Sequence, residues 1–186
     1  MPIARVLASP DRSEPAATEL AGSPPPSWTK VELRRPLRLV LSPEFGRGAL
    51  DGAWWPYSRD LAREAVDLVD RAPAPFGRIW RVLYSTPDWE PCPRRVKAAD
   101  TFVSLGSFPH DDTHLVMLKG VASSRVLRLL VVPPEWGERT ARHAMRIAAT
   151  PSNVMSAATI LSESVDLLLA GLLFHWDDDG GADVQP

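Results

Sequence analysis

Two adjacent tryptophans constrain this chain more than any other feature of its 186 residues. Trp54 and Trp55 lie in the segment Asp-Gly-Ala-Trp-Trp-Pro-Tyr-Ser-Arg-Asp-Leu, residues 51–61, at a predicted junction between a strand and a helix. Successive side chains of a strand point to opposite faces of its sheet, so the two rings must face opposite sides. One ring can fill a core while the other faces something else, which makes this segment the first candidate binding site.

Charge and composition exclude several classes of protein. The net charge is −2 with mixed signs, which argues against nucleic-acid binding, where basic residues usually cluster. Cys92 is the single cysteine, so no intramolecular disulfide can form. The longest apolar run, Leu167 to Phe174, is far shorter than the roughly 20 residues that span a bilayer, and the first residues lack the apolar core of a signal peptide. We therefore expect a cytoplasmic protein that does not bind membranes.

The chain divides into three parts by composition. Residues 1–30 are rich in Pro, Ala, Ser and Glu, and such a segment buries too little apolar surface to offset its conformational entropy. We predict a disordered leader over 1–30, a single α+β domain over 31–176, and a flexible acidic tail over 177–186.

Alternation of apolar and polar side chains predicts about six strands within this domain. They are expected at about 33–41, at a short segment ending with the tryptophan pair, and at about 76–85, 101–108, 114–120 and 125–132. Pro36 favours an edge position or a strand start for the first of them. Short turns join the last three strands, which predicts an antiparallel meander.

Helical spacing of apolar residues predicts two or three helices. One is expected over 58–71 with Ser58 as its N-cap, one over 135–149, and one after Pro151, capped by Ser152 and running to Trp176. Because the strands follow one another without βαβ alternation, the predicted fold is α+β, an antiparallel sheet of about six strands with the helices on one face.

Two segments are candidate binding surfaces, and each has a purely structural alternative. In the first, Trp54 and Trp55 could stack a ligand, with Tyr57 beside them and with Arg59 and Asp60 as a charged pair at a helix start. The alternative is that Trp54 fills the core, Trp55 covers a sheet edge, and the charges cap a solvated helix.

The second candidate surface is the proline-rich segment 87–95, which carries Trp89, Arg94 and Arg95. The alternative there is a stiff connection in which Trp89 covers one end of the sheet.

Residues for catalysis or metal binding do not converge in the sequence. The cluster at 110–114, His-Asp-Asp-Thr-His, is typical of a hairpin turn, and we predict no metal site and no cofactor. Cys92 lies between two prolines with no histidine nearby, which favours a structural loop over a nucleophile.

Several blocks of the chain resemble one uncharacterised family from high-GC Gram-positive bacteria. They are Leu-Asp-Gly-Ala-Trp-Trp-Pro at 50–56 with Ser-Arg-Asp-Leu at 58–61, then Tyr84, Asp88-Trp89, Pro-Arg-Arg at 93–95 and Leu-Leu-Val-Val-Pro-Pro at 129–134. The resemblance spans roughly 33–160 and implies a small stand-alone cytoplasmic protein with no assigned activity. The chain departs from the pattern at Tyr57, where the family carries a basic residue.

These observations favour a non-enzymatic binding or regulatory protein with an aromatic and arginine surface centred on Trp55, Arg59, Trp89 and Arg94. The alternative is a small-molecule-binding protein or enzyme with a pocket between the sheet and helix 58–71.

The C-terminal helix gives a separate expectation about self-association. It is apolar around most of its circumference, so we expect a residual apolar surface that supports a homodimer through Leu168, Leu172 and Trp176. The alternative is a monomer in which this helix covers a second, otherwise open face of the sheet.

Overall fold

A computed structural model describes residues 35–98, 101–108, 113–122 and 124–177 of the chain. The predicted leader over 1–30 and nearly all of the predicted tail over 177–186 lie outside the described residues, as do His110, Asp111 and Asp112 of the predicted turn. The side chains of Leu168, Leu172 and Trp176, named above for a homodimer, also lie outside the described part.

The described strands form one seven-stranded sheet in the order β1-β2-β7-β6-β3-β5-β4. The strands are β1 (Leu39–Leu41), β2 (Gly52–Trp54), β3 (Ile79–Ser85), β4 (Arg95–Ala98), β5 (Thr101–Phe108), β6 (Leu115–Gly120) and β7 (Val126–Val131). β1 lies at an edge, as Pro36 indicated. β4 was not predicted, because it is short and follows the proline-rich segment 87–93 that reads as a loop.

The sheet is mixed, so the prediction of a purely antiparallel sheet is wrong. β2 pairs with β7 and β3 pairs with β5 in parallel, whereas the other four pairs are antiparallel. The predicted meander is also wrong, because β3 lies between β5 and β6 and separates them. Only β6 and β7 form the expected hairpin. Alternation of side chains marks a strand but carries no information about its neighbour, so these pairings could not be deduced locally.

Three α-helices accompany the sheet in the described part of the chain: α1 (Leu61–Asp70), α2 (Glu138–Ala148) and α3 (Ala157–Asp177). The N-cap of α1 is Asp60 rather than Ser58, since its carboxylate accepts the backbone N–H of Arg63 at 3.2 Å. Similarly, Ser156 rather than Ser152 caps α3, because the Ser156 hydroxyl accepts the N–H of Thr159. Among the described helices, none combines the length and apolar character that a membrane span requires.

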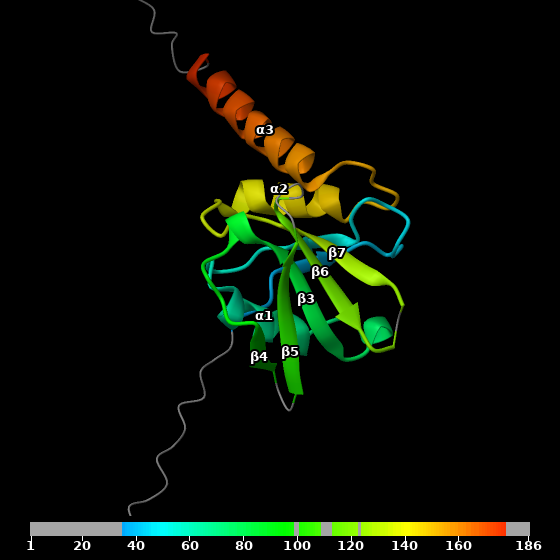
Figure 1. Cartoon of the computed structure of the whole chain (residues 1–186). Coiled ribbons are helices and arrows are strands. Elements are labelled where there is room, and N and C mark those ends of the chain that lie inside the picture. Colours follow the sequence, from blue (N-terminus) through cyan, green and yellow to red (C-terminus); the bar gives the residue numbers. More distant parts are fainter. Residues whose placement is uncertain (1–34, 99–100, 109–112, 123, 178–186) are drawn as a thin grey trace, which may run out of the picture. The chain divides into compact units, whose positions relative to one another are not determined.

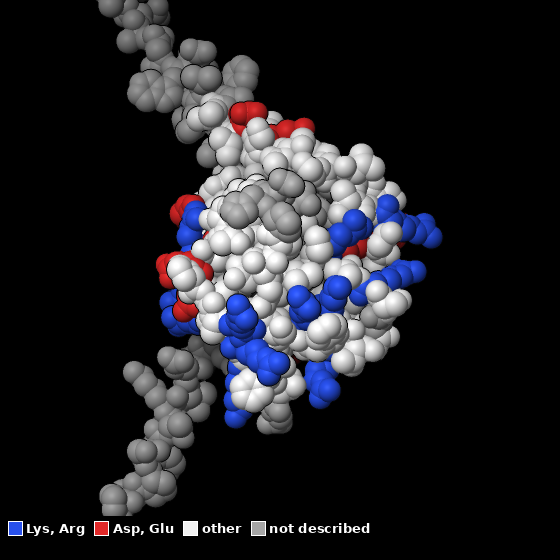
Figure 2. Space-filling model, viewed as in Figure 1, with Lys and Arg blue, Asp and Glu red and all other residues white. Residues whose placement is uncertain are grey.

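The helices cover both faces of the sheet, which corrects the expectation of helices on one face (Figure 1). α1 packs on a core that includes Trp54, whereas α2 and the first turns of α3 pack on a second core that includes Trp55. Figure 2 shows basic side chains spread over the front of the molecule, while most visible acidic side chains lie along its upper and left margins. Because each face of the sheet has its own core, both tryptophans can be buried.

The residues that precede the tryptophan pair anchor β2 between its neighbours. Gly52 has a φ of 153°, and a Cβ atom there would lie 2.2 Å from the carbonyl oxygen of Val40 in β1. The buried carboxylate of Asp51 accepts backbone N–H groups from Gly46 at 2.6 Å and Arg128 at 2.8 Å. Asp51 thus ties the turn before β2 to the start of β7, and Gly52 lets β1 approach.

Candidate functional site

Trp54 and Trp89 are structural residues on the α1 side of the sheet. Their rings stack with centroids 5.3 Å apart and an interplanar angle of 25°, and their exposed fractions are 1% and 7%. Two segments far apart in the sequence, each a candidate surface, therefore meet inside one core. Neither ring is available as an exposed binding platform.

Trp55 and Tyr57 hold an arginine on the opposite side of the sheet. The guanidinium of Arg38 lies 3.5 Å from the centroid of the Trp55 ring and 3.8 Å from that of Tyr57. Its Nε donates to the Trp55 carbonyl at 2.9 Å, and an Nη donates to the carbonyl of Pro56. Desolvation by burial lowers the pKa of Arg38, although Tyr57 and Glu64 act in the opposite direction. The stacked arginine is thus held in one position by both rings and by two carbonyls.

An open groove lies above this stack, between β1 and α2. Its volume is about 850 Å³, within the usual range for pockets that bind small molecules. Arg38, Arg142 and Arg146 contribute positive charge, and no acidic side chain is among the lining residues. The rest of the lining is largely apolar or aromatic: Pro36, Leu37, Leu39, Val40, Leu41, Trp55, Tyr57, Met145, Ala149 and Thr150.

The two arginines of α2 differ in how fully they are paired. Arg142 pairs with Glu138 one turn earlier, at 2.7 Å, in an exposed ion pair. Arg146 contacts the Nδ1 atom of His143 at 3.0 Å, and an imidazole, unlike a carboxylate, carries no negative charge that could neutralise the guanidinium. The indole N–H of Trp55 is buried and has no acceptor in the described part of the chain. The groove therefore combines an apolar floor with cationic groups at its α2 side.

The groove does not coincide with the pocket expected between the sheet and helix 58–71. The centre of that interface is filled by Leu61, Ala65 and Leu68, which are fully buried against the sheet. A smaller hollow of about 530 Å³ remains at the C-terminal end of α1. The larger hollow lies instead between the edge strand β1 and α2.

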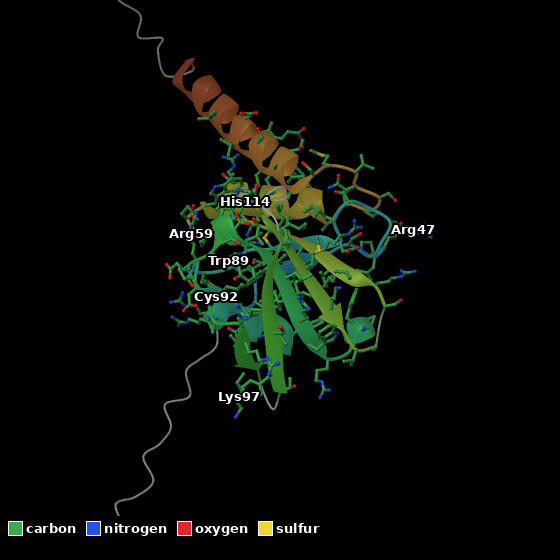
Figure 3. The ribbon with its side chains drawn as sticks, viewed as in Figure 1. Arg47, Arg59, Trp89, Cys92, Lys97 and His114 are labelled. Carbon is green, nitrogen blue, oxygen red and sulfur yellow. The ribbon has the colours of Figure 1, made fainter. Side chains whose placement is uncertain are left out.

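A second polar cluster lies at one end of the sheet, where β2, β3 and β7 have their carboxyl ends. Asp88, just after β3, accepts the backbone N–H of His114 at 2.7 Å and contacts its Nδ1 at 3.2 Å. His114 has a φ of 61°, a left-handed conformation that its hydrogen bond to Asp88 stabilises. Arg59 forms an ion pair with Glu135 at 2.5 Å beside them. Figure 3 shows Arg59, Trp89 and His114 on the same side of the molecule.

Comparison with known proteins identifies a family but no activity. A model of the family of unknown function DUF5994 matches residues 38–148, more than half of the chain. The chain belongs to this family. Neither the curated proteins nor the solved structures contain a match to it. The DUF5994 region runs from Arg38 in the stack to the end of α2, so most of the lining of the groove lies within it.

Several predicted site residues of this DUF5994 protein lie apart from the groove. Asp60 caps α1, and Arg59 is occupied by its ion pair with Glu135. Arg94 and Arg95 are exposed at the opposite edge of the sheet, where Arg95 starts β4. Of the residues named from the sequence, the structure places Trp55 and Tyr57 at the groove.

Cys92 does not contact a base. Its thiol donates to the hydroxyl of Tyr84 at 3.2 Å, and this hydrogen bond together with burial raises the pKa of Tyr84 to about 12. Among the described residues, no group of three or more His, Cys, Asp and Glu side chains could hold a metal ion.

Sequence reasoning missed the three arginines of the groove. Arg142 and Arg146 are four residues apart on α2 and therefore share a face, but the same spacing is typical of a solvated helix surface. Arg38 precedes β1 in a segment that reads as an ordinary strand. The only indication in the sequence was that arginines occur both before β1 and on α2. That these two segments lie side by side is decided by the tertiary structure.

We expect the substitution Asp88→Asn to alter the pH dependence of stability. Desolvation by burial raises the pKa of the Asp88 carboxyl, although His114 and Arg59 act in the opposite direction. Between the ordinary and the raised pKa this carboxyl binds more protons in the folded than in the unfolded chain, so its contribution to the free energy of unfolding falls as pH rises. Asparagine does not titrate, and this fall should disappear from urea unfolding measured across that pH window. The control Asp60→Asn should retain it, and equal pH profiles for wild type and Asp88→Asn would refute the expectation.

Proposed function

We propose that this DUF5994 protein is a binding protein for an anionic small molecule with an apolar body, held in the groove between β1 and α2. The observation that carries the proposal is the lining of the groove, which has arginines on an apolar and aromatic surface and no acidic side chain. Arginine forms charge-assisted, bidentate hydrogen bonds with carboxylates, sulfonates and phosphates. An organic acid matches this lining, because its anionic group can pair with the arginines and a small aromatic or aliphatic body can pack on the apolar surface.

The preorganised stack supports binding rather than catalysis. Arg38 already donates to two carbonyls, so it contributes positive potential to the floor without having to reorient. The lining residues include no histidine, cysteine or carboxylate, the groups that most often transfer protons or attack a substrate. The groove thus supplies recognition, and Arg142 and Arg146 are the side chains that we propose contact the anionic group.

Titration with anilinonaphthalene sulfonate, an aromatic anion, tests this function. The wild type should bind it with a dissociation constant on the order of micromolar. The double substitution Arg142→Gln/Arg146→Gln should weaken binding about a hundredfold or more, since each of the two charged hydrogen bonds contributes about 1.5–3 kcal/mol. Ala149→Trp, which fills the groove without removing charge, should abolish binding.

Two controls distinguish electrostatic recognition of the anion from non-specific apolar binding. Arg139→Gln removes one exposed arginine of α2 that does not line the groove and should leave the affinity unchanged. Phenylnaphthylamine lacks the sulfonate and should bind the wild type and the double variant equally. The proposal fails if the wild type does not bind the sulfonate, or if the double variant binds it as tightly as the wild type.

A further inference from the structure

Strands β3–β7 carry positive charge only. Their sequences contain five basic residues and neither aspartate nor glutamate, and the basic residues are Arg81, Arg95, Lys97, Lys119 and Arg128. The acidic residues of the described chain lie on the helices and in the connections. A net charge of −2 therefore averages over a strongly uneven distribution.

All these basic side chains point to one face of the sheet. Their neighbours Val82, Val96, Leu118 and Leu127 belong to the core under α1, so the basic side chains point to the opposite side. On that side α2 packs mainly on β1, β2 and β7. In Figure 1 none of the helices in the described part of the chain lies in front of β3 and β5, and Figure 2 shows Lys and Arg side chains gathered over this part of the surface.

The register of the strands arranges three of these charges in a row. Arg95 of β4 lies opposite Ser104 of β5, Ser104 opposite Arg81 of β3, and Arg81 opposite Lys119 of β6. Neighbouring strands are about 4.8 Å apart, so the row extends across four strands and carries a charge on three of them, with Ser104 between Arg95 and Arg81. Like charges directly opposite each other, as in Arg81 and Lys119, destabilise a sheet. A polyanion bound along the row would remove that repulsion.

Exposed aromatic rings accompany the row. Phe102 is 66% exposed and lies opposite Lys97, and Trp80, at the bulge in β3, is 43% exposed. An exposed ring on an open sheet face is a platform for unstacked bases, and such stacking does not depend on base identity. Neither ring is needed for the core, since Phe102 and Trp80 are outside it.

We propose that this open face, formed by β3–β6, binds single-stranded nucleic acid, with Arg95, Lys97, Arg81 and Lys119 contacting phosphates and Phe102 stacking on a base. The face requires single strands because a duplex does not present base faces to a ring. This site is distinct from the groove between β1 and α2. The net charge of −2 argued against nucleic-acid binding, but the local charge of a face, rather than the net charge, attracts phosphates.

Fluorescence anisotropy of a labelled oligodeoxythymidylate tests the proposal. An oligomer of about 12 nucleotides matches the usual site size of one small domain. We expect binding in low salt. The logarithm of the association constant should fall linearly with the logarithm of the salt concentration. Arg95→Gln/Lys97→Gln should lower the affinity and reduce the salt slope by roughly 1.4, about 0.7 for each phosphate that is no longer neutralised. Phe102→Ala should weaken binding about tenfold without changing that slope.

The control Arg63→Gln/Arg139→Gln removes two exposed charges from helices and should bind as the wild type does. A duplex of the same length should bind more weakly, and polyglutamate should not displace the oligomer. Three results overturn the proposal: no binding in low salt, equal binding by wild type and Phe102→Ala, or displacement by polyglutamate at matched charge. The last would assign the face to an acidic protein instead.

Discussion

Replacing Trp54 by alanine should lower the free energy of unfolding by about 3–5 kcal/mol, the usual range for a large aromatic removed from a core. The ring is almost completely buried and stacks on Trp89, so its removal leaves a cavity that the rigid sheet and α1 cannot close. Urea unfolding followed by far-UV circular dichroism measures the change. Trp89→Ala should show a comparable loss, and the two losses should not add, because the rings stack on each other.

Trp80→Ala is the matched control, since it makes the same chemical change at an exposed position of β3 in the same sheet. It should cost about 1 kcal/mol or less, as surface substitutions do. Trp55→Ala should also be costly, because Trp55 is only 8% exposed and supports Arg38. Equal losses at Trp54 and Trp80 would contradict the placement of Trp54 in the core.

Replacing Asp51 by alanine is expected to cost about 2–6 kcal/mol, because two partly buried N–H donors, of Gly46 and Arg128, lose their acceptor at about 1–3 kcal/mol each. The guanidinium of Arg128, 3.9 Å from the carboxylate, also loses its counter-charge. Urea unfolding gives the total. Hydrogen exchange of the Gly46 and Arg128 amides shows where the stability is lost, since both amides should exchange faster in the variant.

Asp51→Asn keeps one acceptor oxygen and should have an intermediate effect. Asp60→Ala removes a different carboxylate, the exposed N-cap of α1, and should cost about 1 kcal/mol. A loss for Asp51→Ala no larger than that for Asp60→Ala would show that Asp51 does not hold the turn to β7.

Local patterns were sufficient wherever an element is defined by its own side chains. β5 occupies Thr101–Phe108, the range that alternation predicted, and β6, β7 and α2 lie within their predicted ranges. The rings of Trp54 and Trp55 point to opposite faces of the sheet, as the local geometry of a strand predicts. The cap of α1 was misplaced by two residues because Ser58 and Asp60 are both good caps, and only the backbone geometry chooses between them.

The arrangement of the elements could not be predicted in the same way. Whether β3 pairs with β5 or with β6 depends on contacts between residues far apart in the sequence, and in the structure it pairs with both. The helices cover two faces of the sheet rather than one, so Trp55 is buried in a second core instead of being exposed. The groove follows from the same arrangement, because Arg38 and Arg146 share it only after β1 and α2 have come together.

The sequence by itself determined the three helices and every strand except β4, and that Trp54 and Trp55 face apart, because these properties depend on neighbours a few residues away. It also determined that the segments forming β3–β7 contain no acidic residue. The tertiary structure alone decided which face remains open, which arginines meet, and that both rings are buried. Strand order and helix placement depend on the packing of the whole chain, and a binding surface is what that packing leaves uncovered.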